Sequence, residues 1–196
     1  MLCSANRFPL PGAPSTCLLD TAIVPLPSFV LIVAFGVYYF HFRRQTTPST
    51  LIPIKWLHIT YLVLVAAQIA MSVLEIIRLA LEQLGVGLLP VNTVALLLVF
   101  TVLWRERASR TKAMISILAV YWFFMTLFEL IKTVRLHRLE TLHPNTANNS
   151  RYPSSDQFLD NAVMLVLYAL FCGTEIVNFF LSRRQSADWN KQGSSV

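Results

Sequence analysis

Five long apolar stretches occupy most of this 196-residue chain. An α-helix rises about 1.5 Å per residue, so about 20 mostly apolar residues match a hydrocarbon core of about 30 Å. Only 13% of the residues are charged and 55% are hydrophobic, which leaves few polar side chains to keep a soluble fold in solution. We therefore expect an all-α polytopic membrane protein, a bundle of five transmembrane helices at about 21–42, 56–82, 86–104, 113–135 and 159–181.

The Lys and Arg residues predict the orientation of these spans. With the N-terminus outside and the C-terminus in the cytosol, most of the 16 basic residues flank the inner ends of the spans, where insertion retains positive charge. Residues 1–20 then form an extracytosolic segment, 21–184 the transmembrane domain and 185–196 a cytosolic tail. The net charge of +6 reflects topology and does not indicate a nucleic-acid ligand. The inner loop between spans three and four carries the largest group of these basic residues: Arg105, Arg107, Arg110 and Lys112.

Charged side chains also lie inside the predicted spans, where isolated charge is costly. Glu75 and Arg78 share one face of span two, Glu129 and Lys132 repeat that spacing in span four, and Glu175 lies toward the inner end of span five. The structural interpretation is a set of ion pairs, within or between helices, that fix packing. The functional interpretation is a proton or ion relay. The pattern favours the structural one, because the charges lie near span ends and have partners of opposite sign.

Aromatic residues are expected to anchor the bundle at the membrane surface, because indole and phenol rings prefer the headgroup level. The residues that fit this role are Tyr38, Tyr39, Trp56, Tyr61 and Trp104.

Two covalent modifications are predicted outside the membrane. Asn148 begins an N-x-S sequon in the long outer loop, which makes it a candidate for glycosylation, with an unmodified loop as the alternative. Cys3 and Cys17 would both lie on the outer side, where an oxidising compartment could join them as a disulfide. Three cysteines without C-x-x-C spacing do not indicate a metal or redox site.

Catalytic motifs are absent from the sequence. The four histidines, His41, His58, His137 and His143, lack metal-ligand spacing, and the chain has no G-x-S-x-G elbow and no Walker lysine. We therefore expect no enzymatic activity, no metal and no cofactor, while a membrane enzyme built from scattered polar side chains stays a third possibility.

The segment Leu103 to Arg110, followed by Ile117 to Trp122, is similar to a charged inner loop that leads into a Trp-containing fourth span. Together with the five-span layout, it resembles transmembrane domain zero. This is the extra N-terminal membrane domain of ABC transporters of subfamily C, the multidrug-resistance-associated and yeast cadmium-factor type. The likeness covers about residues 20 to 184.

This resemblance implies an accessory domain that packs beside a transporter core in the plasma or vacuolar membrane and helps trafficking, stability or regulation. The chain departs from the full-length pattern because it has no second set of spans, no nucleotide-binding domain and no Walker motif. ATP hydrolysis is therefore not expected.

Two function classes stay open. In the first, the protein is an integral membrane protein of the secretory pathway that contacts the lipid bilayer and binds a larger membrane transporter or another membrane protein. Small residues on spans one and three would let a partner helix approach, namely Ala34, Gly36, Thr93 and Ala95. In the second, a small autonomous transporter or channel uses Glu75, Arg78, Glu129 and Lys132. The sequence shows no internal repeat or mid-span Gly/Pro interruption that would favour it.

Overall fold

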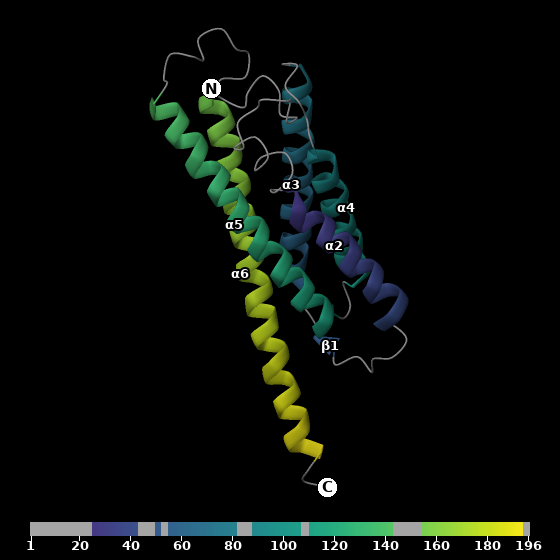
Figure 1. Cartoon of the computed structure of the whole chain (residues 1–196). Coiled ribbons are helices and arrows are strands. Elements are labelled where there is room, and N and C mark those ends of the chain that lie inside the picture. Colours follow the sequence, from purple (N-terminus) through teal and green to yellow (C-terminus); the bar gives the residue numbers. More distant parts are fainter. Residues whose placement is uncertain are drawn as a thin grey trace.

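The computed structural model describes residues 25–42, 50–51, 55–81, 88–106, 110–142 and 154–193. Its helices alternate in direction along the chain (Figure 1). They are α2 (Leu26–Val37), α3 (Lys55–Leu81), α4 (Leu89–Arg105), α5 (Lys112–Leu142) and α6 (Ser154–Gly193), and a π-helical segment, η2 (Tyr38–Phe42), continues α2. The five-helix membrane bundle predicted from the apolar stretches is confirmed in this arrangement.

The described elements also include two short strands, which the all-α prediction does not contain. Strand β1 (Thr50–Leu51) pairs antiparallel with β2 (Arg110–Thr111), with Thr50 opposite Thr111 and Leu51 opposite Arg110. This two-residue ladder joins the segment before α3 to the segment before α5. It therefore holds both connections at the lower end of the bundle, as Figure 1 is oriented.

Prolines mark the start of the two shorter helices. α2 has Pro27, and α4 has Pro90, within the first two helical positions. A proline is tolerated there because the first amides of a helix have no intrahelical acceptor, and its fixed φ suits the first turn.

Helix lengths differ from the predicted spans. α3, α5 and α6 contain apolar segments long enough to cross a membrane, at Lys55–Arg78, Lys112–Val134 and Phe158–Arg183. α4 has 17 residues, and α2 has 12 before the five residues of η2, so these two are shorter than predicted. α5 and α6 are longer, since α5 continues to Leu142 and α6 continues through most of the predicted tail.

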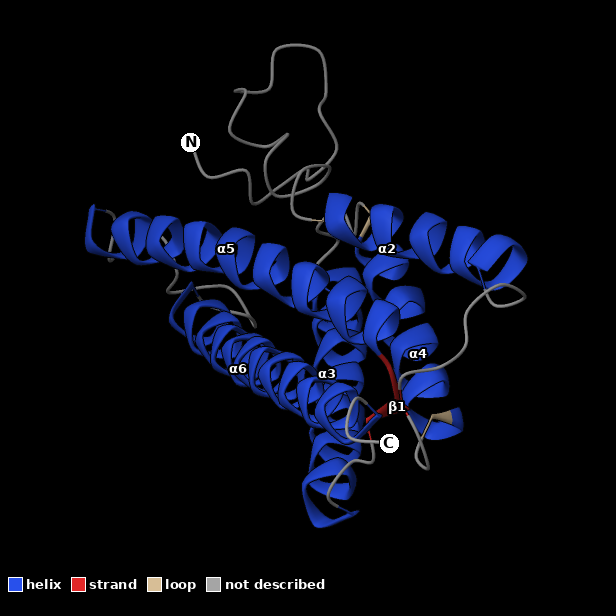
Figure 2. Cartoon of the chain, turned by 90° about the horizontal axis from the view of Figure 1, so that it is seen from below, coloured by secondary structure: helices blue, strands red, loops and turns tan. Residues whose placement is uncertain are grey.

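The helices are arranged as two packed pairs with one helix laid across them. α3 packs along α4, α5 packs along α6, and contacts between α3 and α6 join the pairs. α2 lies against α4 and α5, which the view from below in Figure 2 also shows. Another flank of α2 is exposed, at Phe29, Val33 and Val37.

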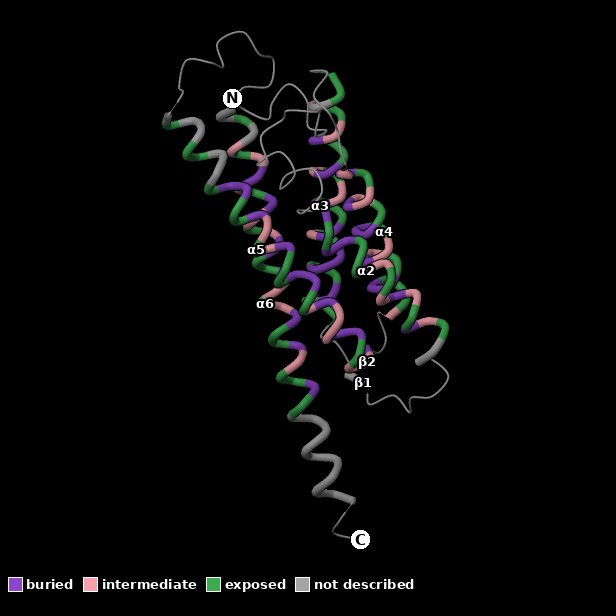
Figure 3. Tube along the Cα trace, in the orientation of Figure 1, coloured by how far each residue is buried: buried purple, intermediate pink, exposed green. Residues whose placement is uncertain are grey.

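Burial alternates around each helix, with buried residues turned inward and exposed residues turned outward (Figure 3). Many exposed residues are large and apolar, such as Val33, Val63, Leu159 and Phe180. A soluble monomer rarely shows so continuous an apolar surface. In a membrane the same surface is solvated by lipid, as expected for this chain.

Aromatic side chains fill the middle of the bundle. Trp122 of α5 is fully buried, with ring centroids 4.7 Å from Phe171 and 5.8 Å from Tyr168 of α6. Tyr61 of α3 completes the group, 5.4 Å from Phe171. This aromatic core joins α3, α5 and α6 at mid-height.

We predict that Trp122→Ala destabilises the bundle strongly, by about 3–5 kcal/mol, because it leaves a large cavity among rings that cannot collapse. The matched control is Phe123→Ala, since this neighbouring ring is 56% exposed and faces lipid. The free energy of unfolding in mixed detergent micelles measures both. Equal losses for the two variants would contradict the assignment of Trp122 to the core.

Candidate functional site

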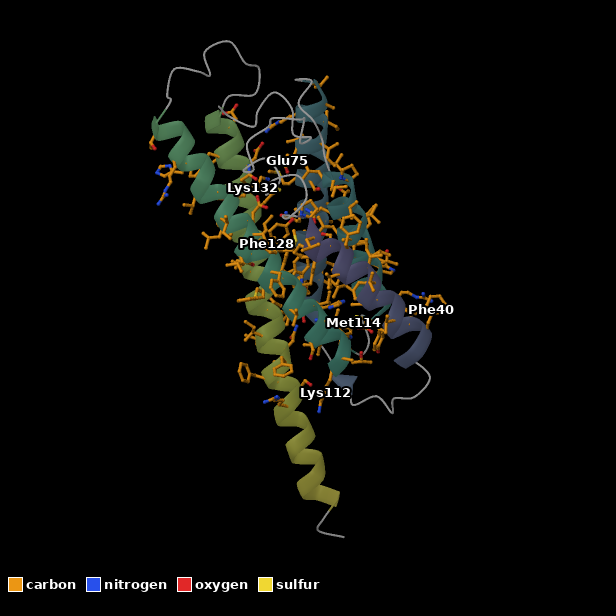
Figure 4. All side chains as sticks on the ribbon, in the orientation of Figure 1. Phe40, Glu75, Lys112, Met114, Phe128 and Lys132 are labelled. Carbon is orange, nitrogen blue, oxygen red and sulfur yellow. The ribbon has the colours of Figure 1, made fainter. Side chains whose placement is uncertain are left out.

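Three buried charged residues meet in the upper half of the bundle, and we call them the upper ion cluster: Glu75, Glu129 and Lys132. The Lys132 ammonium Nζ lies 3.1 Å from Glu75 Oε1 and 3.4 Å from Glu129 Oε1. Figure 4 shows Glu75 and Lys132 next to each other between α3 and α5. The cluster therefore ties α3 to α5 across the bundle.

The local sequence explains half of this cluster. Glu129 and Lys132 are three residues apart on α5, so they share one helix face. Glu75 reaches them from a helix that is not adjacent in sequence, which periodicity cannot show. The sequence left open whether the charges pair within or between helices. Glu75 pairs between helices, with Lys132 of α5.

Arg78 donates a hydrogen bond to Asp160 at the start of the apolar part of α6. The sequence suggests neutralisation of Arg78 by Glu75 or Glu82 on its own helix, and it suggests only a helix-start role for Asp160. Glu82 lies outside the described residues. The Arg78–Asp160 ion pair thus joins α3 to α6 near the upper end, one helical turn beyond the upper ion cluster.

A second buried ion pair lies at the lower end. Arg110 Nη2 of β2 donates to Glu175 Oε1 of α6 at 2.8 Å, and the two side chains are 1% and 0% exposed. Burial alone lowers the pKa of Arg110, but the Glu175 carboxylate and Tyr61 raise it above its ordinary value, so the guanidinium stays charged. We call this contact the lower ion pair.

The lower ion pair shows that the basic residues of the inner loop lie in different surroundings. Arg105 is exposed at the end of α4 and Lys112 is half-buried at the start of α5, whereas Arg110 points into the bundle. Arg107 lies outside the described residues. Arg110 is buried because it reaches Glu175 of α6. The charge pattern of the loop cannot show this contact.

Two of the predicted membrane-surface aromatics are also buried. Tyr61 Oη accepts a hydrogen bond from Trp122 Nε1 at 2.7 Å, and its ring faces the Arg110 guanidinium at 6.0 Å. Tyr38 Oη lies 2.9 Å from Thr111 Oγ1. Trp56 and Trp104 are exposed, as expected for anchors.

Sequence reasoning missed a neutral polar cluster at the centre. Ser28 of α2 donates to Asn92 of α4 at 2.9 Å, and Asn92 Nδ2 donates to the Tyr168 hydroxyl of α6 at 3.3 Å. Tyr121 of α5 donates to Asn92 Oδ1 at 3.5 Å. Asn92 therefore contacts side chains of three other helices. An asparagine inside an apolar span was the available signal, because such a side chain usually bonds across helices.

The upper ion cluster and the lower ion pair are separated along the bundle, and the aromatic core contacts the lower ion pair through Tyr61. Glu75 and Tyr61 are 14 residues apart on α3, which is about 21 Å of helix. The aromatic core lies between the upper ion cluster and the lower ion pair. The arrangement is suited to tying helices at three heights, and it supplies no continuous row of charged groups among the described residues.

In the described ranges, no three His, Cys, Asp or Glu side chains lie close enough together to hold a metal ion. Cys3, Cys17 and Asn148 lie outside these ranges, so the disulfide and the glycosylation stay predictions.

We predict that Lys132→Met lowers the free energy of unfolding by about 3–5 kcal/mol, because it leaves buried carboxylates without their ammonium partner. Adding Glu75→Leu should recover part of that loss. Unfolding in detergent measures both variants, with Arg105→Gln as the control because this cation is exposed and forms no ion pair with any described residue. If Lys132→Met unfolded with the same free energy as the wild type, Lys132 would not stabilise the packing of α5 against α3.

A second prediction concerns the lower end. Arg110→Gln should lower the melting temperature clearly, because Glu175 then keeps a buried charge without its partner. Arg105→Gln, which removes an exposed cation of the same loop, should leave the melting temperature nearly unchanged. Similar shifts for the two variants would show that Arg110 is not buried.

Comparison with known proteins agrees with this architecture. The family model described as the ABC transporter TMD0 domain matches residues 8–152, which include α2 to α5. No curated protein and no solved structure matches the chain significantly. The match covers well over half of the chain and confirms the resemblance to transmembrane domain zero of ABC transporters. The chain belongs to the ABC transporter TMD0 domain family, a family of helical membrane domains.

Proposed function

We propose that this accessory membrane domain acts by binding a larger membrane transporter through the free flank of α2. Family membership supports the accessory role. The finer role that we propose is help in trafficking, stability or regulation of that partner, without catalytic activity. One observation carries the proposal: α2 packs against α4 and α5 and leaves a long apolar flank exposed.

The residues of this flank follow helical spacing. Phe29, Val33 and Gly36 lie at i, i+4 and i+7, and Phe40 continues the row. Val33 is 65% exposed, and Figure 4 shows Phe40 pointing away from the bundle. A Cβ added at Gly36 would meet nothing within 4 Å, so a neighbouring helix could approach the backbone there. We call these four residues the α2 flank.

The buried charges support packing rather than transport. Two ion pairs between different elements engage these charges, Glu75 with Lys132 and Arg110 with Glu175. A transport path needs groups that can exchange their partner for a substrate, and removing these from their pairs would cost several kcal/mol each. We therefore infer that they stabilise the bundle.

We propose that the lower end of the bundle faces the cytosol, with the N-terminus outside. Arg105 and Lys112 lie at this end and form no ion pair with any described residue, whereas Arg78 and Lys132 of the upper half are paired. Insertion retains Lys and Arg residues that closely flank the spans on the cytosolic side. The plasma membrane and the vacuolar membrane are the two proposed locations.

The test is affinity purification of the full chain from native membranes in mild detergent. We predict that a larger membrane transporter co-purifies in stoichiometric amount, and that Gly36→Leu reduces its recovery by blocking the α2 flank. Gly173→Leu on α6 is the matched control, because a Cβ there also meets nothing within 4 Å. Size-exclusion profiles check that both variants fold.

Recovery of the wild-type chain only as a lone monomer would contradict the proposal. Ion or solute flux through liposomes that contain the purified chain alone would favour the small autonomous transporter or channel.

A further inference from the structure

A groove of about 420 Å³ lies between α2 and α5. Its walls are apolar and include Val30 and Ala34 of α2 and Val120 and Phe124 of α5. The two hydroxyl groups among its residues are engaged elsewhere. Ser116 donates to the backbone carbonyl of Lys112, and Tyr121 contacts Asn92 in the central polar cluster. The groove thus presents hydrocarbon to its occupant.

The groove is long and runs with the helices. On α5 it extends from Ser116 to Phe128, which is about 18 Å of helix. An α-helix with its side chains is about 10 Å across. A single extended hydrocarbon chain is narrower. Since these helices lie in a membrane, lipid acyl chains are the solvent that meets this face.

A cation stands at the lower end of the groove. Lys112 begins α5 one turn below Ser116, so the two share a helix face. Figure 4 shows Lys112 at the lower end of α5 and Phe128 farther up the same helix. Its ammonium forms no ion pair or hydrogen bond with any described residue, whereas the nearby Arg110 is neutralised by Glu175. A basic side chain at the mouth of an apolar groove between helices is complementary to a lipid phosphate.

We propose that this groove binds one acyl chain of an anionic phospholipid, with the phosphate of its headgroup at Lys112. The chain would lie against Val30, Val120 and Phe124, and the hydrogen bond between Tyr38 and Thr111 would close the gap between α2 and β2 below it. This proposal rests on residence in the membrane and not on binding of a transporter, so either can fail alone.

The experiment uses the purified full chain in lipid nanodiscs. The probe is phosphatidylglycerol with a photoreactive diazirine in one acyl chain, and labelled peptides are identified by mass spectrometry. We expect the label on the groove residues of α2 and α5 to exceed that on Val166, an exposed apolar residue of α6. Val120→Trp, which fills the groove, should abolish the excess, and Val166→Trp should preserve it. Val30→Trp fills the same groove from α2 if the first variant does not fold.

The headgroup contact is tested separately, by competition of the probe with unlabelled lipids. Lys112→Gln should weaken phosphatidylglycerol binding about fivefold, as expected for one basic residue at a membrane surface, and should remove the preference over phosphatidylcholine. Arg105→Gln is the control of equal charge change, and Lys112→Arg should keep the preference.

Two results would overturn the proposal. The first is equal labelling of Val120 and Val166, which means ordinary surrounding lipid. The second comes from a photoreactive amino acid at position 120 in native membranes, where a polypeptide adduct without any lipid adduct would show that a helix fills the groove.

Discussion

An isolated ammonium or carboxylate in a membrane interior must find a partner, because no water is there to solvate it. In this bundle three ion pairs between different described elements meet that requirement. Lys132 brings α5 to Glu75 of α3, and Arg110 brings β2 to Glu175 of α6. The apolar surfaces between these points are less selective, because lipid tails are as apolar as leucine and give helices little reason to prefer each other. The ion pairs supply that preference at the two ends, and the rings around Trp122 supply it at mid-height.

α6 is an integral part of this bundle although the family match ends at residue 152. It provides Asp160 to Arg78 at the upper end, Tyr168 and Phe171 to the aromatic core, and Glu175 to the lower ion pair. Each of these contacts reaches a different height of the bundle. The matched region alone would leave Arg110 buried without its carboxylate, so the folding unit extends beyond the matched residues.

The sequence predicted the membrane bundle and its helix number because hydropathy and helical spacing are local properties. It also placed five charged residues inside the spans, without showing which of them are neighbours. It did not predict that Arg110 and Tyr61 are buried. Arg110 lies in a loop between two spans and Tyr61 near the start of one, and both residue types are common at the membrane surface. Only the packing of α6 against β2 and α3 removes them from the surface. The central contacts of Asn92 and the groove beside α2 were missed for the same reason. Each depends on which helices are adjacent, and no periodicity within one helix contains that information.

The length of α6 has a mechanical consequence. Its 40 residues correspond to about 60 Å, twice the thickness of a hydrocarbon core. Figure 1 shows its last turns projecting below the other helices. A continuous helix resists bending, so the last turns of α6 keep a fixed distance and direction relative to the part of the helix in the membrane. A small tilt of α6 in the membrane would swing that distal end through a much larger arc.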